Sequence, residues 1–268
     1  MARLTAGDIR VWLTTRGALR VPEITALFWV IKGLSTAMGE STSDYLVHVM
    51  PPVAAVLLGF VGFVVALLLQ FRMAQYVALR YWLAVVMVGT FGTMAADVLH
   101  VGFGVPYTAS SILYAGLLAA IFIAWRRTEH TLSIHSIDRP RRELFYWAAV
   151  VATFAMGTAL GDFTAYTLHL GYFPSAVIFA AVIGVPAIGY RWMHWNAVFS
   201  FWFAYVITRP LGASIADGLA KPPAAKGLGL GSGWVALAFG SIIVALVAYL
   251  SASEADVQGV PALDGEQA

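Results

Sequence analysis

Cysteine is absent from the 268-residue chain, and charged residues make up only 11% of it. Without cysteine there is no disulfide, no thiolate metal site and no cysteine nucleophile. The scarcity of charge, together with 60% hydrophobic residues and a mean hydropathy of +0.79, excludes an ordinary soluble globular domain. The loops are too short for a separate catalytic or nucleic-acid-binding domain. We therefore expect an integral membrane protein whose main partner is the lipid bilayer, with no nucleic-acid partner.

Eight apolar segments are present, and each is close to the 20 or so apolar residues that a transmembrane helix needs. Proline, glycine or arginine marks most of the junctions between them. The segments are 24–47, 52–71, 79–100, 107–126, 144–168, 174–192, 197–219 and 233–251. The sequence therefore predicts an all-α polytopic membrane protein with eight transmembrane helices in one domain, residues 23–251.

Most of the basic residues lie on one predicted side of the membrane. Those in the N-terminal segment or in the loops after each even-numbered helix are Arg3, Arg10, Arg16, Arg20, Arg72, Arg80, Arg126, Arg127, Arg139, Arg141, Arg142 and Arg191. The positive-inside rule then places both termini in the cytoplasm. Residues 1–22 are predicted to be a basic cytoplasmic segment, either amphipathic on the membrane surface or poorly ordered, and 252–268 a polar tail.

The same pattern occurs in every second segment. An aromatic residue and a tryptophan are followed by a glycine ten residues after the tryptophan (+10) and by an aspartate at +15. The four sets are Trp29, Gly39, Asp44; Trp82, Gly92, Asp97; Trp147, Gly157, Asp162; and Trp202, Gly212, Asp217. Such recurrence indicates internal repeats. We predict four parallel two-helix repeats, at about 23–75, 76–135, 140–193 and 196–251, around an axis along the membrane normal.

The first repeat also resembles a known family. It reads Val21-Pro22-Glu23-Ile24-Thr25, then Phe28-Trp29, Lys32 and Gly39-Glu40. With the fourfold two-helix organisation, this is similar to a bacterial family of uncharacterised membrane-anchored proteins described as a "repeat of unknown function". The resemblance covers about residues 21–250. It implies a bacterial inner-membrane protein with eight helices, and it supplies no established activity.

The repeated aspartates are the leading candidates for a functional site. An ionisable group inside a membrane span costs about 2.5–3.5 kcal/mol on insertion scales, so such groups usually face the bundle interior. The alternative is a carboxylate at each helix end. Residues four apart share a helix face, which adds the polar side chains at +3, +7 and +11 to a predicted ion pathway. These are Lys32, Thr36, Glu40, Thr93, Thr158 and, in the fourth repeat, Arg209.

Two cations lie inside predicted helices. Buried charges are normally paired, and the candidate partners of Lys32 and Arg209 are Glu23, Glu40 and the aspartates. Lys32 has a second interpretation, in which its side chain snorkels to the membrane surface. Arg209 is too central for that, so an ion pair with a carboxylate is expected.

Histidines follow three of the aspartates. His48, His100 and His169 come four, three and seven residues after Asp44, Asp97 and Asp162. Carboxylates with imidazoles would suit a divalent cation such as manganese, iron, cobalt, nickel or zinc, as a substrate or a bound ligand. Histidine at a membrane interface is the alternative.

The remaining repeated residues suit helix packing. Glycines at one register allow helices to approach closely, which predicts a central bundle of the four tryptophan-containing helices with the others outside. The glycines are Gly39, Gly92, Gly157 and Gly212. Trp29, Trp82, Trp147 and Trp202 are expected to be packing or interfacial aromatics.

Two functions fit this sequence. The first is a transporter or channel-like protein that moves a cation, either a divalent metal ion or a proton coupled to a small solute. The second is a membrane scaffold or sensor whose buried charges are structural ion pairs. We expect no enzymatic activity, because the chain has no H-E-x-x-H motif, no phosphate loop and no nucleophile elbow.

Overall fold

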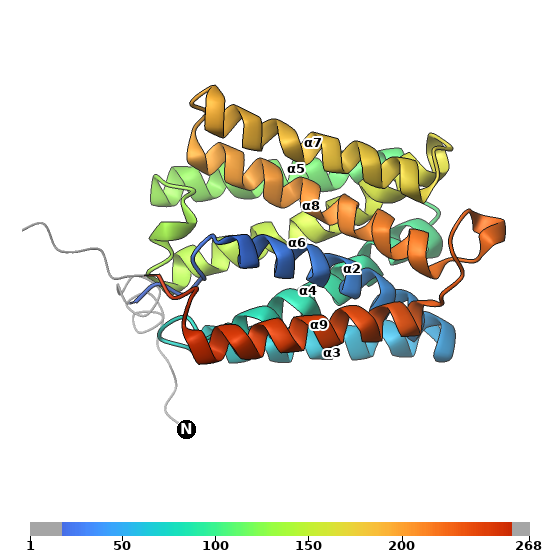
Figure 1. The fold of residues 1–268 in the computed structure, drawn as a ribbon, viewed down its shortest axis with the longest axis horizontal. Helices are drawn as coiled ribbons and strands as arrows, with labels where there is room; N and C mark the ends of the chain where they lie inside the picture. Colours follow the sequence, from blue (N-terminus) through green and yellow to red (C-terminus); the bar gives the residue numbers. More distant parts are fainter. Residues whose placement is uncertain (1–17, 259–268) are drawn as a thin grey trace, which may run out of the picture.

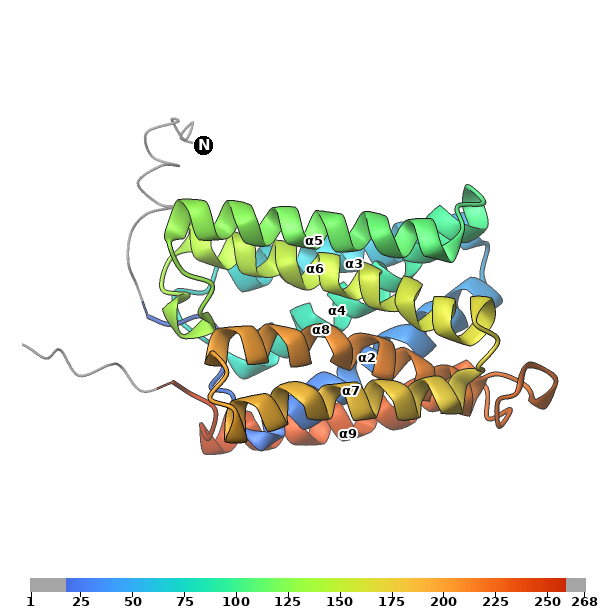
Figure 2. The ribbon, with the colours of Figure 1, turned by 90° about the horizontal axis from the view of Figure 1, so that it is seen from above.

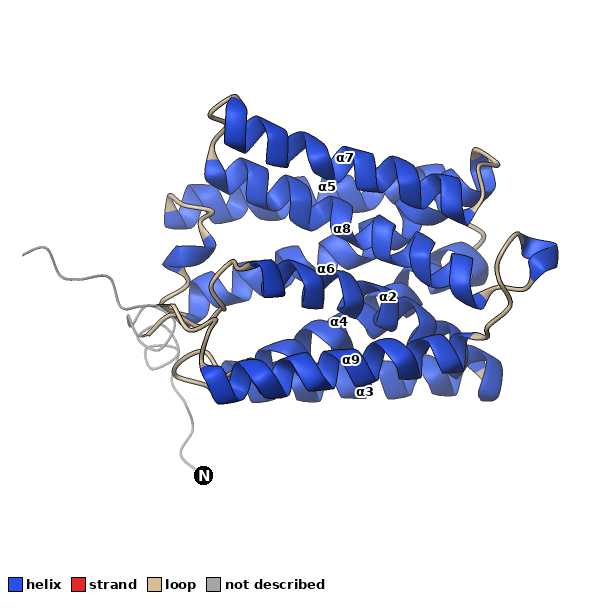
Figure 3. Cartoon of the chain, in the orientation of Figure 1, coloured by secondary structure: helices blue, strands red, loops and turns tan. Residues whose placement is uncertain are grey.

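The computed structural model describes residues 18–258, which are helical with no strand in that range (Figure 3). The long helices are α2 (Ala26–Val49), α3 (Pro52–Phe71), α4 (Ala78–Asp97), α5 (Tyr107–Glu129), α6 (Pro140–Asp162), α7 (Tyr172–Trp192), α8 (Ala197–Ala220) and α9 (Ser232–Ser253). Two π-helical turns, η1 (Val98–Gly102) and η3 (Phe163–Thr167), and two 3-10 turns, η2 (Ile134–Ser136) and η4 (Pro223–Ala225), complete the set. The predicted all-α fold with eight helices is confirmed, while most of the basic segment 1–22 lies outside the described residues.

Seven of the eight long helices in residues 18–258 are apolar and long enough to cross a membrane. The exception is α2, which has 24 residues but contains Lys32, Glu40 and Asp44. These charged side chains lower the hydropathy of α2, although it lies alongside the other helices (Figures 1 and 2). The chain is therefore a membrane-type helical protein.

Local sequence sets several helix ends. The Thr25 hydroxyl accepts a hydrogen bond from the Phe28 amide at 3.2 Å and caps α2. The Asn196 side chain caps α8 in the same way, as short polar residues do at this position. Pro52 and Pro140 occupy first helical positions, where no intrahelical partner exists for an amide hydrogen.

The helices form an inner ring and an outer shell (Figures 1 and 2). In the inner ring, α2 packs against α4 and α8, and α6 packs against the same two helices. Each outer helix packs more extensively on the inner helix of the following repeat than on its own: α3 on α4, α5 on α6, α7 on α8 and α9 on α2. The last repeat thereby closes the ring on the first.

The repeated glycines lie where neighbouring inner helices meet. A Cβ atom added to any of them would contact a residue at +7 of the next repeat in the ring. The pairs are Gly39 with Gly89, Gly92 with Phe154, Gly157 with Arg209 and Gly212 with Thr36. The same type of helix–helix contact thus recurs four times around the ring, which gives the inner helices an approximate fourfold pseudosymmetry.

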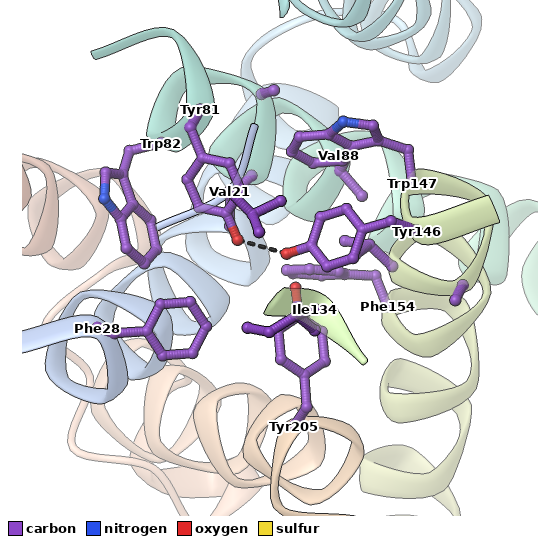
Figure 4. Close-up of a cluster of buried hydrophobic side chains, with 14 of the residues drawn as sticks. Val21, Phe28, Tyr81, Trp82, Val88, Ile134, Tyr146, Trp147, Phe154 and Tyr205 are labelled. Carbon is purple, nitrogen blue, oxygen red and sulfur yellow. Dashed lines mark hydrogen bonds between the residues drawn. The ribbon is translucent and has the colours of Figure 1, made fainter. Parts of the chain in front are cut away.

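The tryptophans gather at one end of the inner ring, here called the aromatic end. They are Trp29, Trp82, Trp147 and Trp202, of which the last three are buried and Trp29 is partly buried. Between them, the Tyr81 and Tyr146 hydroxyls share a hydrogen bond, and Tyr205 points towards this pair (Figure 4). The aromatic end is therefore filled by a packed cluster of rings.

Loop segments tie the aromatic end together. Arg20 Nη1 lies 2.8 Å from Glu143 Oε2 in a buried ion pair. The Glu23 amide donates to the Asp256 backbone oxygen at 2.8 Å, and the Tyr76 hydroxyl donates to the Asp256 carboxylate. The first residues after α9 thus pack against the segment that precedes α2.

Asp256 gives the fold a pH-dependent contribution. Burial raises the pKa of its carboxyl above 3.8, and the hydrogen bond from Tyr76 offsets this only in part. A group whose pKa is raised by folding contributes stability that is fully present below its unfolded pKa and is lost as pH rises through the folded value. As pH rises above about 4, the usual pKa of an aspartate, we expect the unfolding temperature of Asp256→Asn to depend less on pH than that of the original chain. A steeper dependence in the variant, measured in the same detergent, would contradict this.

Candidate functional site

A polar layer crosses the inner ring, with Arg209 at its centre. Arg209 is 0% exposed. Its Nη2 donates to Glu40 Oε2 at 2.6 Å and to Thr158 Oγ1 at 2.7 Å, and it also bonds Thr93 Oγ1. Its Nη1 donates to the Thr36 backbone oxygen at 3.3 Å. Glu40, Thr93 and Thr158 all occupy position +11, so three repeats converge on the arginine of the fourth.

The polar layer contains a buried ion pair. Glu40 is 4% exposed, and Thr93 Oγ1 also lies 3.3 Å from its Oε2. The expected pairing of Arg209 with a carboxylate is therefore found, with Glu40 as the partner. Two charges taken out of water lose several kcal/mol each in hydration, which close contact and added hydrogen bonds offset. The two threonines provide such bonds here.

Lys32 lies on the aromatic side of this layer, and no carboxylate in the described part of the chain forms an ion pair with it. Its side chain is 0% exposed, and its Nζ lies 4.3 Å from the ring centroids of both Phe154 and Tyr205. Within residues 18–258, Nζ has no hydrogen-bond partner. Neither the expected ion pair nor the snorkelling alternative is found, because at +3 the inner face of α2 meets aromatic rings. Attraction between a cation and the ring faces takes their place.

The four repeated aspartates lie towards the opposite end of the ring, here called the aspartate end, and they are not equivalent. Lys221 follows α8, and its Nζ contacts the Asp44 carboxylate and lies 3.7 Å from Asp217 Oδ1. Asp97 and Asp162 are partly buried, and neither has an ion pair among the residues that the structure describes. Lys221 is thus the ion-pair partner of aspartates from two repeats. The aspartates of the other two repeats have no such partner among the described residues.

The charge of Lys221 is fixed by its neighbours. Burial works against the charged form, but Asp217 and Asp44 outweigh it and raise the pKa of Lys221 well above 10.5. The two carboxylates therefore favour the protonated form of Lys221. Sequence reasoning missed this residue because it lies beyond the end of the predicted helix 197–219. Its position four residues after Asp217, one helical turn, was the signal that could have found it.

The two aspartates without a cation share a backbone feature. The α-helix α4 ends at Asp97 and α6 ends at Asp162, and in both cases the chain continues as a π-helical turn, η1 or η3. The inner helices of the other two repeats, α2 and α8, run past their aspartates as regular α-helix. Because π turns occur frequently at functional sites, this feature singles out Asp97 and Asp162.

The histidines do not join the carboxylates. His48 Nδ1 lies 2.8 Å from the backbone oxygen of Asp44, and His100 Nδ1 lies 2.7 Å from that of Val105. His169 is exposed in the turn after η3. Across the described part of the chain, no three histidine, aspartate or glutamate side chains form a group that could hold a metal ion. The expected metal site is not assembled, because two of the imidazoles bind backbone carbonyls instead.

Comparison with known proteins gives one match. A family model described as "Repeat of Unknown Function (DUF347)" matches four segments, residues 27–76, 80–131, 145–194 and 200–256. Each matched segment contains one inner helix and the outer helix that follows it, so the resemblance expected from the first repeat is confirmed. No curated protein and no solved structure matches the chain.

Proposed function

The chain belongs to the family described as "Repeat of Unknown Function (DUF347)", and we propose that it is a membrane transporter in which Asp97 and Asp162 bind a transported or coupling cation. We propose a proton as that cation, exchanged during the movement of a small solute. The support is the unequal pairing of the aspartates, since two share Lys221 and two have no ion pair in the described residues.

A carboxylate inside an apolar bundle requires compensation for its lost hydration. Ion pairing with a fixed side chain supplies it permanently, whereas binding a proton or a mobile cation supplies it reversibly. Asp44 and Asp217 have the first kind of compensation from Lys221. Asp97 and Asp162 are suited to the second kind, since both residues are only partly buried.

The polar layer supplies a second part of the mechanism. Arg209 and Glu40 are held by one another and by Thr93 and Thr158. A rearrangement of Arg209 and Glu40 would connect the aspartate end with Lys32. Beyond Lys32, the packed rings of the aromatic end close the axis. We propose that this layer separates the two sides in the conformation described here.

We propose that all eight helices cross a bacterial inner membrane, with both termini and the aromatic end in the cytoplasm. The loops and last helical turns at that end contain Arg72, Arg126, Arg139 and Arg191, and basic residues near the ends of spans are retained on the cytoplasmic side. The aspartate end then faces outward. We also propose that the chain is not an enzyme, because its axis brings together an arginine, threonines and carboxylates rather than a nucleophile held by a base.

Proton flux into proteoliposomes that contain a pH-sensitive dye tests the proposal. We expect a measurable flux for the original chain and a loss of about tenfold or more for Asp97→Asn and Asp162→Asn, since an amide cannot exchange a proton. Glu254→Gln is the matched control, because Glu254 is exposed beyond α9 at the other end of the bundle. Equal flux in the original chain and both aspartate variants would exclude the assignment. A parallel measurement with a manganese-quenched dye identifies a divalent cation if that is what moves.

A scaffold or sensor remains the second candidate, and the closely held Arg209–Glu40 pair favours it. In that case, neutralising Asp97 and Asp162 changes the unfolding temperature and leaves no flux to lose. The same proteoliposome preparations, assayed for unfolding after detergent extraction, distinguish the two functions.

A further inference from the structure

A cavity of about 700 Å³ lies between α2, α7 and α8, away from the inner axis. Its walls are mainly apolar, and neither Arg209 nor any of the four repeated aspartates lines it. Residues that form the walls include Trp29, Gly33, Ile183, Pro186, Phe201 and Leu211. A volume of this size with mostly apolar walls is typical of sites for small organic molecules.

One carboxylate and one imidazole line this cavity, those of Glu23 and His135. No lysine or arginine lines it. His135 Nε2 lies 3.3 Å from Glu23 Oε1, and both side chains are about half exposed (51% and 44%). The Glu23 carboxylate therefore gives the cavity a group that attracts positive charge, and the aromatic ring of Trp29 belongs to the same lining. We call it the acidic cavity.

We propose that the acidic cavity binds a lipophilic organic cation. The apolar body of the ligand packs against α7 and α8, and its positive charge lies beside Glu23 and Trp29. A second cavity, of about 600 Å³ between α5 and α8, is lined by Arg126 and has the opposite charge. The preference for a cation thus belongs to the acidic cavity and does not depend on the function proposed for the axis.

Binding of radiolabelled tetraphenylphosphonium to the detergent-purified chain, measured by equilibrium dialysis against a detergent blank, tests this proposal. We expect saturable binding, and binding about fivefold weaker for Glu23→Gln, where a partly exposed charge is lost. Tetraphenylborate has nearly the same shape and the opposite charge. We expect it to bind more weakly than the phosphonium ion. Equal binding of the two ions would show an apolar crevice for acyl chains and overturn the proposal.

A substitution that fills the acidic cavity tests whether the phosphonium ion binds there. A Cβ atom added at Gly33 meets nothing within 4 Å, so Gly33→Phe can occupy the cavity without a clash. We expect it to abolish binding. Gly116→Phe is the matched control, because Gly116 on α5 is equally open and lies outside the acidic cavity. If Gly33→Phe elutes as aggregate, Gly33→Leu replaces it. Phosphonium binding that persists in a folded filling variant contradicts the proposal.

Discussion

Arg209→Met is expected to lower the free energy of unfolding by about 3–5 kcal/mol, because it leaves Glu40 as a buried carboxylate without its counter-ion. Arg209 and Glu40 are 0% and 4% exposed, so water cannot replace the lost partner without opening the ring. Thr93 and Thr158 would lose a hydrogen-bond donor as well. Reversible unfolding in mixed micelles, followed by tryptophan fluorescence, gives the value.

Removing both charges is expected to restore most of this loss. Replacing a buried ion pair by apolar residues of similar volume is often neutral or stabilising, so Glu40→Met combined with Arg209→Met should be more stable than Arg209→Met alone. Arg126→Met is the control for loss of an arginine, because Arg126 is exposed. If Arg209→Met is as stable as the original chain, the polar layer is hydrated.

Gly39→Ala is expected to destabilise the chain by about 1–3 kcal/mol, the usual effect of overpacking. An added Cβ would lie 2.8 Å from the backbone carbon of Gly89 and 3.0 Å from its Cα. Backbone atoms cannot turn aside as a side chain can, so α2 and α4 must move apart. That displacement also moves Glu40, the next residue, away from Arg209.

Gly33→Ala on the same helix is the matched comparison. Nothing lies within 4 Å of a Cβ at Gly33, and replacing a glycine in a helix interior by alanine gains about 0.5–1 kcal/mol. The two substitutions are chemically identical and should have opposite effects on the free energy of unfolding. Equal effects would show that α2 and α4 are not in close contact.

Sequence periodicity was sufficient to predict the helices and the fourfold repeat. The spacing of tryptophan, glycine and aspartate placed Glu40, Thr93 and Thr158 at one register, and these residues meet around Arg209 in the fold. Register alone could predict this because the four inner helices are arranged around a common axis. The same spacing gave no information on which aspartates are paired.

The remainder of the site depends on contacts between distant repeats. Lys221 and Asp44 are 177 positions apart in the chain, and only closure of the ring brings them together. The environment of Lys32 depends on Phe154 and Tyr205, from the third and fourth repeats. Helical spacing reports neighbours on one helix, and these contacts join different helices. His48 and His100, by contrast, bind backbone oxygens close to them in the chain, which no side-chain pattern reveals.

The packing of each outer helix on the next repeat determines the order in which a nascent chain can mature. The first inner helix, α2, leaves the ribosome before its partners α8 and α9 have been synthesised. The carboxylates of Glu40 and Asp44 therefore have these ion-pair partners only after Arg209 and Lys221, in the last repeat, have been synthesised. Because chains are made from the N-terminus, the carboxylates of the first inner helix are the last to be paired. The last step in the biogenesis of this protein is thus the packing of α8 and α9 against α2, which closes the ring.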